Sequence, residues 1–199
     1  MEIFNRLFSA AEVAELTGVS KYNLQSYQHR GHLSLGGVET EGGTVQGKRR
    51  SFYFHMVVQI ALANALIDQG VSAKSAFSYV REFAFIGGGS FENDPGRWAG
   101  MPFHHEHGET ILAISGGRSC ITRWRSNGSD YFSETIGRLG GSDFSAAIFL
   151  NASRIFADIC GRLDLHPNEV LDEAYAEGFP DEGPEWPGSA TSVPGLERR

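Results

Sequence analysis

The spacing of apolar and polar residues near the start of the chain predicts two short helices that follow each other closely. Ser9 and Glu12 form a capping box, in which each side chain accepts a hydrogen bond from the other residue's backbone N–H, so a helix begins directly after Ser9. Gly18 ends this helix, because glycine adopts the left-handed C-cap conformation without strain. Ser20 caps a second helix that runs from Lys21 to about Arg30. Two short helices joined by such a turn are typical of a helix-turn-helix.

The next segments predict a β-hairpin and two further helices. Residues 32–35 and 50–54 are short extended pieces, and the glycine-rich stretch between them suits a long hairpin tip, or wing. Apolar residues recur at helical spacing through residues 55–69, and Gly70 closes this helix. Ser72 caps a fourth helix, which the next run of glycines ends.

The remainder of the chain predicts a second region of mixed structure. Residues 87–108 are rich in glycine and proline and indicate a linker or long loop. Asn151 and Pro167 suit the first residues of two helices, the first of which presents an apolar face for packing on a sheet. The predicted strands of that sheet are Thr110–Ile114, Arg118–Trp124, Tyr131–Ile136 and Ala146–Leu150.

Together these elements define an α+β protein with four segments. They are a mostly helical winged helix-turn-helix at 1–86, the linker or long loop at 87–108, a small domain of antiparallel sheet and helices at 109–176, and an acidic, proline-rich tail at 177–199 that we expect to be disordered. The small domain is the expected place for dimerisation, or for binding a small effector or a protein partner.

Charge is distributed unevenly along the chain. The 199 residues include 17 Lys and Arg and 24 Asp and Glu, which gives a formal net charge of −7. Lys21, Arg30 and the triplet Lys48-Arg49-Arg50 lie in the first segment, whereas acidic residues crowd the end of the chain. Only the first segment therefore suits contact with nucleic-acid phosphates, despite the negative total.

Nothing in the sequence indicates a membrane or a secreted protein. No apolar run approaches the ~20 residues that a membrane span needs, and the first residues lack the layout of a secretory signal. Cys120 and Cys160 lie far apart and form no disulfide framework, which fits a reducing compartment. We expect a cytoplasmic protein.

Several landmarks appear in the order that one family of DNA-binding proteins shows. The segment 23–28, Asn-Leu-Gln-Ser-Tyr-Gln, is followed by Gly-His-Leu, and Gly47 to Arg50 is followed by the aromatic Phe52. Gly70-Val71-Ser72 then opens a further helix. Over residues 7–85 the chain resembles the MerR-type winged helix-turn-helix. The resemblance implies that the second helix enters the major groove and that the wing flanks it.

Under this resemblance the second helix and the basic triplet carry the DNA contacts. Polar side chains on the helix read base edges in the major groove, and the triplet reaches the phosphate backbone or the minor groove. Tyr27 either donates its hydroxyl to a phosphate or packs against the core. The candidate contact residues are Lys21, Tyr22, Asn23, Gln25, Ser26, Tyr27, His29, Arg30, Lys48, Arg49 and Arg50.

The chain departs from the family pattern in its recognition helix and in its dimerisation element. Gln25 and Ser26 stand where the family usually has Arg and Tyr, so the family's operator sequence is not implied. The long coiled-coil helix that joins two subunits in the family is excluded by the glycines at 87–89 and by Pro95. We therefore expect a homodimer formed through the C-terminal region, and repression by occupying an operator rather than activation by untwisting a promoter.

One histidine-rich segment offers the only metal candidates of the sequence. His104, His105 and His107, with Cys120 as a possible thiolate, are ligand types that suit zinc, copper or nickel. Adjacent histidines of a strand point to opposite faces, and in a loop they are commonly solvated. The sequence therefore favours no metal and no cofactor. Because it also shows no nucleophile elbow, phosphate loop or recurring acid pair, we expect no enzyme.

The function that the sequence favours is a sequence-specific DNA-binding transcription regulator that acts on double-stranded DNA. One alternative is an accessory factor for recombination, similar to an excisionase, since such factors use similar winged domains. A second alternative is a protein-interaction module that has kept the fold but lost DNA binding. The net charge and the residues at positions 25 and 26 leave this second alternative open.

Overall fold

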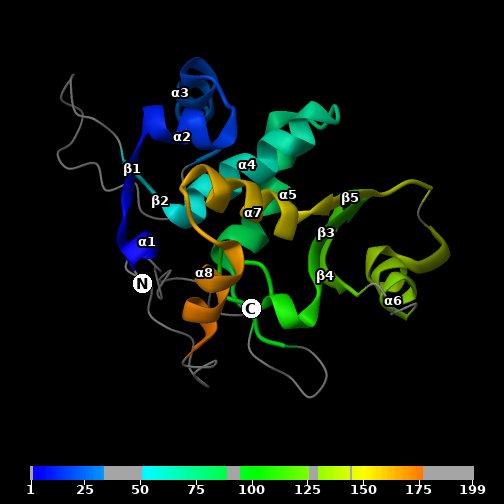
Figure 1. Cartoon of the computed structure of the whole chain (residues 1–199). Helices are drawn as coiled ribbons and strands as arrows, with labels where there is room; N and C mark the ends of the chain where they lie inside the picture. Colours follow the sequence, from blue (N-terminus) through cyan, green and yellow to red (C-terminus); the bar gives the residue numbers. More distant parts are fainter. Residues whose placement is uncertain (1, 34–50, 89–94, 126–129, 144, 177–199) are drawn as a thin grey trace, which may run out of the picture.

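The computed structural model describes residues 2–33, 51–88, 95–125, 130–143 and 145–176 (Figure 1). Its α-helices are α1 (Glu2–Asn5), α2 (Ala10–Thr17), α3 (Lys21–His29), α4 (Phe54–Asp68), α5 (Ala73–Phe85), α6 (Asp130–Leu139), α7 (Ala152–Arg162) and α8 (Pro167–Tyr175). Two 3-10 helices are η1 (His105–His107) and η2 (Gly141–Asp143). The strands β1 (Leu7–Ser9) and β2 (Ser51–Tyr53) form one antiparallel sheet, and β3 (Glu109–Ser115), β4 (Arg118–Trp124) and β5 (Ile148–Asn151) form another. The chain therefore mixes helices with small antiparallel sheets, and none of the helices described is both long and apolar enough to span a bilayer.

Helices α2 and α3 begin and end where the sequence predicts. The Ser9 hydroxyl accepts from the backbone N–H of Glu12, and the Glu12 carboxylate accepts from the backbone N–H of Ser9 at 2.8 Å. Gly18 ends α2 with a φ of 74°, a left-handed conformation that glycine adopts readily. Ser20 caps α3 by accepting from the backbone N–H of Asn23 at 3.1 Å. Only a short turn separates the two helices.

Strand β2 pairs with β1 and not with His32 and Leu33, and the remainder of the predicted hairpin, residues 34–50, lies outside the described residues. In the β1–β2 sheet Phe8 lies opposite Phe52, and both side chains are fully buried. His32 and Leu33 lie in the turn after α3 rather than in a strand. The predicted hairpin is therefore wrong over these residues, because burying the two phenylalanines side by side fixes the partner of β2.

Helix α4 occupies the centre of the hydrophobic core. It carries apolar side chains on all sides and packs against α2, α5 and α7. At its first turn, the ring of Phe54 lies 5.6 Å from that of Phe4, 6.3 Å from that of Phe8 and 5.9 Å from that of Phe156. A helix that is apolar all round must be covered all round. Elements from both ends of the chain therefore meet on α4, and one hydrophobic cluster runs from Phe8 to Ala174.

Residues 95–108 pack along the end of α5 and beside α8. Arg97 pairs with Gly88 through both backbone groups, at 2.8 and 2.9 Å, and Met101 and Phe103 are buried. The Arg97 guanidinium is buried too, and it donates to the main-chain carbonyls of Glu82, Phe83, Ile86, Trp98 and Met101. Among these carbonyls, those of Phe83 and Ile86 lie at the end of α5, where no helical N–H reaches them.

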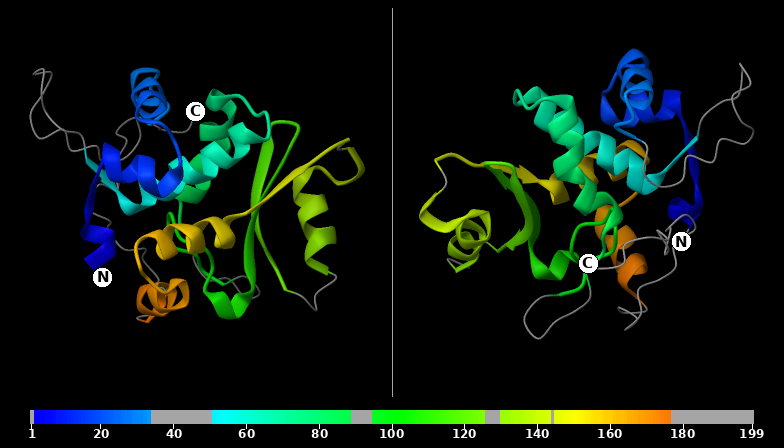
Figure 2. Two further views of the ribbon diagram at one scale, coloured as in Figure 1. Left: turned by 45° about the horizontal axis from the view of Figure 1, so that its top comes forward. Right: turned by 180° about the vertical axis from the view of Figure 1, so that it is seen from behind.

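The three-stranded sheet has β3 in its centre and helices on both faces (Figure 2). The strands predicted at 110–114 and 118–124 are present as β3 and β4, which the turn at Gly116 and Gly117 joins with Leu112 opposite Ile121. Helices α7 and α5 cover one face, and α6 covers the other. The predicted strand at 131–136 is wrong, because this segment forms α6. Its Leu139 is buried against Ala113 and Cys120, so α6 closes a face that a fourth strand would have left open.

Helix α7 connects the sheet to the N-terminal helices, and α8 packs against α7. Asn151 caps α7 by accepting from the backbone N–H of Arg154 at 2.8 Å, and Pro167 occupies the first turn of α8, as predicted. The apolar face of α7 packs on β3 and α4 within the same chain. At its other end, the Arg162 side chain donates to the carbonyls of Glu15, at 2.8 Å, and Leu16. These two bonds tie the end of α7 to the end of α2.

Candidate functional site

Helix α3 presents most of the predicted DNA-contact residues on one exposed face. Its inner face is held by Leu24 and Tyr27, which are buried one turn apart. The helix carries no acidic residue, and Tyr22 is 78% exposed. The exposed predicted residues are Lys21, Tyr22, Asn23, Gln25, His29 and Arg30, with Ser26 partly exposed. The helix projects at one end of the described part of the molecule (Figure 1).

Tyr27 is the predicted contact residue that the structure places in the core. Its side chain is only 8% exposed, and its ring packs edge-on against Phe77 at 5.0 Å between centroids. Burial also raises the pKa of its hydroxyl. Of the two roles predicted for Tyr27, these contacts favour packing.

Lys48, Arg49 and Arg50 lie outside the described residues. Ser51, the first residue of β2, follows Arg50 directly in the sequence. Their contacts with DNA therefore stay a prediction from the sequence.

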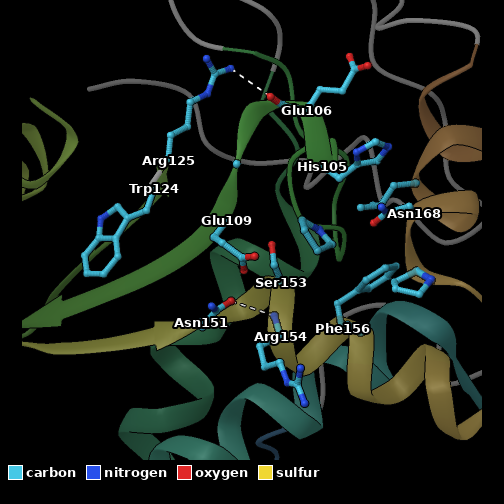
Figure 3. A pocket seen from close by; sticks show the side chains of 15 residues that line it. His105, Glu106, Glu109, Trp124, Arg125, Asn151, Ser153, Arg154, Phe156 and Asn168 are labelled. Carbon is cyan, nitrogen blue, oxygen red and sulfur yellow. Dashed lines mark hydrogen bonds between the residues drawn. The ribbon is translucent and has the colours of Figure 1, made fainter. Parts of the chain in front are cut away.

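A polar pocket of about 620 Å³ lies where residues 102–109, the end of β4 and the first turns of α7 and α8 meet (Figure 3). Arg125, Arg154, Glu106 and Glu109 bring two positive and two negative charges to its lining. Asn151 and Ser153 add uncharged polar groups, and Phe156 and Leu171 form the apolar part of the wall.

Much of the polar lining of this pocket already has partners within the chain. The Arg125 guanidinium donates to the carbonyls of Glu106 and His107, at 3.2 and 3.1 Å. The Ser153 hydroxyl accepts from the backbone N–H of Thr110 at 2.9 Å. A small polar molecule in this pocket would therefore add to an existing network rather than fill a set of vacant donors.

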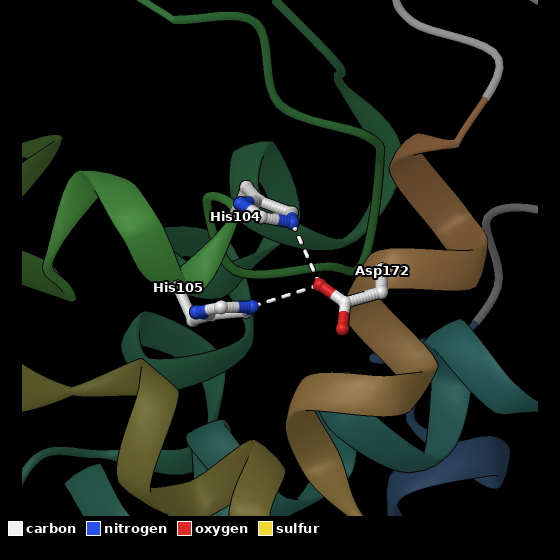
Figure 4. Close-up of side chains that lie close together, drawn as sticks. All are labelled: His104, His105 and Asp172. Atoms are coloured by element: carbon white, nitrogen blue, oxygen red, sulfur yellow. Dashed lines mark hydrogen bonds and ion pairs between the residues drawn. The ribbon is translucent and has the colours of Figure 1, made fainter.

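Two histidines and an aspartate meet at the edge of this pocket (Figure 4). The Nε2 atoms of His104 and His105 lie 3.0 and 2.8 Å from the same oxygen, Oδ1 of Asp172. The three ligand atoms lie within 4.8 Å of one another. The hydrogen bonds from the two imidazoles lower the pKa of Asp172.

The structure brings together only part of the metal candidates from the sequence. His104 and His105 meet, whereas His107 and Cys120 lie outside this group. Burial and the positive charge of Arg123 lower the pKa of His107. Cys120 lies opposite Ala113 in the sheet, on the side that α6 covers, and burial raises the pKa of its thiol.

Sequence reasoning missed Asp172, although it placed the helix that carries it. The pattern of α8 marks Val170, Leu171 and Ala174 as its buried face, and all three are buried. Asp172 belongs to the other face of α8. Only the packing of α8 beside residues 102–107 shows that this carboxylate faces two histidines that lie far away in sequence.

Comparison with the models of known protein families finds no match for this chain, and comparison with curated proteins finds none either.

Proposed function

We propose that the protein is a sequence-specific DNA-binding transcription regulator that uses α3 as its recognition helix. The observation that carries this proposal is the exposed face of α3, which combines lysine, arginine and histidine with amide and hydroxyl side chains and no carboxylate. Amide side chains such as Asn23 and Gln25 suit hydrogen bonds to base edges, and Lys21 and Arg30 suit phosphates.

The dimensions and surroundings of α3 support the same proposal. An α-helix with its side chains is about 10–12 Å across, which fits the roughly 12 Å width of the major groove. Helix α2 lies directly before it, and the basic triplet directly precedes β2. A winged helix-turn-helix of the MerR type has such a pair of helices, and we propose that Lys48 to Arg50 belong to its wing.

The proposed mode of action is repression by occupying an operator. Helix α5 ends at Phe85, and residues 95–101 turn back along it, so the described part of the chain contains no long helix to act as a coiled coil. Promoter untwisting needs two rigidly spaced recognition helices, whereas occlusion needs only occupancy. We propose a homodimer through residues 109–176, which a measurement of molar mass by light scattering would test.

The pocket of Figure 3 is the place that we propose for a small effector, if the regulator responds to one. It lies between α7, which is bonded to the end of α2 through Arg162, and α8. A molecule bound in the pocket would therefore be connected to α2, the helix before α3, through α7 alone.

The proposal is tested by selecting a DNA site from a random duplex pool and measuring affinity over a salt series. Replacing Lys21 or Arg30 by alanine removes a phosphate contact, so the slope of log affinity against log salt should fall by about one. Asn23→Ala and Gln25→Ala should each reduce discrimination against a scrambled duplex by roughly 5- to 150-fold, since a base contact contributes about 1–3 kcal/mol.

The matched control is Lys74→Ala, which removes an exposed positive charge from α5 and should leave both quantities unchanged. Failure of the pool to yield any preferred site would instead favour the protein-interaction module. An equal effect of Lys74→Ala and Lys21→Ala would show that α3 is not the contact surface.

A further inference from the structure

We propose that His104, His105 and Asp172 form a binding site for a divalent zinc-type metal ion, which joins the loop before β3 to α8. The carrying observation is that two imidazole nitrogens and one carboxylate oxygen converge on one point from two separate elements (Figure 4). This site is independent of the proposed contact of α3 with DNA.

The spacing of the three atoms is close to that of metal ligands. Nε2 of His104 and Nε2 of His105 lie 3.0 and 2.8 Å from Oδ1 of Asp172. Bonds of about 2.0–2.1 Å in a tetrahedral site put ligand atoms about 3.3 Å apart. The two separations that involve Asp172 would therefore have to grow by only a few tenths of an ångström, which rotation of the half-exposed Asp172 side chain can supply, and the two Nε2 atoms lie within 4.8 Å of each other.

The backbone geometry explains why two adjacent histidines face the same way. In a strand they would point to opposite faces, but the chain turns into the 3-10 helix η1 at His105. The centroids of the two rings lie 4.3 Å apart, with 31° between their planes. The nearly stacked rings thus aim both Nε2 atoms at α8.

Contacts on both sides of the histidines hold this arrangement before any ion binds. The Tyr175 hydroxyl, on the same helix as Asp172, donates to the carbonyl of Pro102 at 2.6 Å. The backbone N–H of Phe103 donates to the Thr110 hydroxyl at 2.8 Å. The loop and α8 are therefore already fixed to each other next to the three ligands, so little ordering is left for the ion to impose.

A metal-bound histidine usually donates its second ring N–H to an acceptor such as a carboxylate, and a carboxylate lies near His104. Its Nδ1 lies 3.7 Å from a carboxylate oxygen of Glu106. In the structure this Nδ1 accepts from the backbone N–H of Glu106 at 3.5 Å. Binding of a metal at Nε2 therefore requires a change of tautomer, which places the proton on Nδ1 beside the exposed Glu106 carboxylate.

The ligand set determines the class of ion. Two imidazoles and one carboxylate, with no thiolate, suit Zn²⁺ and leave its fourth position for water or a small ligand. His105 also lines the pocket of Figure 3, so such a ligand would come from that side.

The experiment is a titration of the full-length, metal-free protein with zinc sulfate in competition with a chromophoric chelator. We expect one equivalent of zinc per chain. His105→Ala and Asp172→Asn should each weaken its affinity at least 10-fold. Asp172→Asn keeps the shape of an exposed side chain, so it remains informative if His105→Ala fails to fold.

The matched control is His107→Ala, which removes a neighbouring imidazole outside the group and should change the affinity by less than about twofold. Zinc should also raise the unfolding temperature of the wild type and of His107→Ala, but not that of Asp172→Asn. Absence of zinc binding by the wild type, or equal binding by Asp172→Asn, would overturn the proposal.

Discussion

The imidazole of His55, in the first turn of α4, is enclosed by aromatic rings and by close-packed backbone. The ring stacks on Tyr53 at 5.8 Å and meets the edge of Phe85 at 5.4 Å between centroids. Gly100 approaches so closely that a Cβ there would lie 2.5 Å from the Cβ of His55. Burial lowers the pKa of His55 to about 4, so the ring is neutral in the folded protein at ordinary pH.

This histidine predicts a loss of stability in mild acid. The unfolded chain takes up a proton on His55 near pH 6.5, whereas the folded protein does so only near pH 4. The stabilising contribution of the neutral ring is therefore complete above pH 6.5 and is lost as the pH falls toward 4, by at most about 3 kcal/mol. Denaturant unfolding at pH 7 and pH 4.5 should show a smaller drop for His55→Gln than for the wild type.

The control for that experiment is His166→Gln, at an exposed position before α8, which should keep the pH dependence of the wild type. Identical drops for the wild type and His55→Gln would contradict the prediction.

The sequence predicts the exposed residues of α3, but it does not predict the third residue of the candidate metal site. The exposed polar residues of α3 follow from helical spacing, because Leu24 and Tyr27 fix which side faces inward. The partner of His104 and His105 does not, because Asp172 is distant in sequence and no local pattern connects them. A signal for it exists only in the packing of α8.

At the scale of elements, the cap signals predict helices well, whereas the strand predictions fail at His32 and Leu33 and again at 131–136. The caps at Ser9, Ser20 and Ser72 are all present. The segment 131–136 is rich in residues that favour strands, yet it forms the first part of α6. Thr135 and Leu139 are buried at helical spacing against β4 and β3, so tertiary packing overrides local preference.

The end of α5 gives a prediction at this scale. Arg97 is the shared donor for several carbonyls, and its charge has no carboxylate partner among the hydrogen bonds described for it. Burial lowers its pKa to about 10, so it still carries its charge at neutral pH. Arg97→Lys cannot reach all these carbonyls and should lower the free energy of unfolding by at least about 2 kcal/mol. Urea unfolding followed by circular dichroism measures this.

Arg154→Lys is the matched control, since its ion pair with Asp158 is exposed to solvent. It should change the free energy of unfolding by less than about 1 kcal/mol. Equal effects of the two substitutions would show that the carbonyl cluster contributes little.

At the scale of the whole molecule, the sequence predicts a division into two segments, but the two segments share one hydrophobic core. The predicted segments 1–86 and 109–176 follow from a glycine-rich stretch, which is a local signal. In the structure α7 packs on α4, and one hydrophobic cluster includes residues from both segments. A pattern of apolar residues shows that α4 is buried on all sides, but not which elements bury it.

The shared core predicts that both segments unfold together. Phe8→Leu removes packing in the first segment. The fluorescence of Trp98 and Trp124 reports on the part of the chain that follows α5. In a Trp186→Phe background, tryptophan fluorescence and far-UV circular dichroism should give one coincident transition, shifted equally by Phe8→Leu. A fluorescence midpoint that does not move would show that the two segments fold independently.

The position of α4 also has a consequence for how the chain is made. The ribosome releases α4 well before α7, because α5 and the whole three-stranded sheet are synthesised between them. During that interval the surface of α4 that Phe156 and its neighbours later cover faces water. The nascent chain therefore passes through a stage with an exposed apolar surface, which is the stage at which a chaperone can bind it or a second nascent chain can aggregate with it.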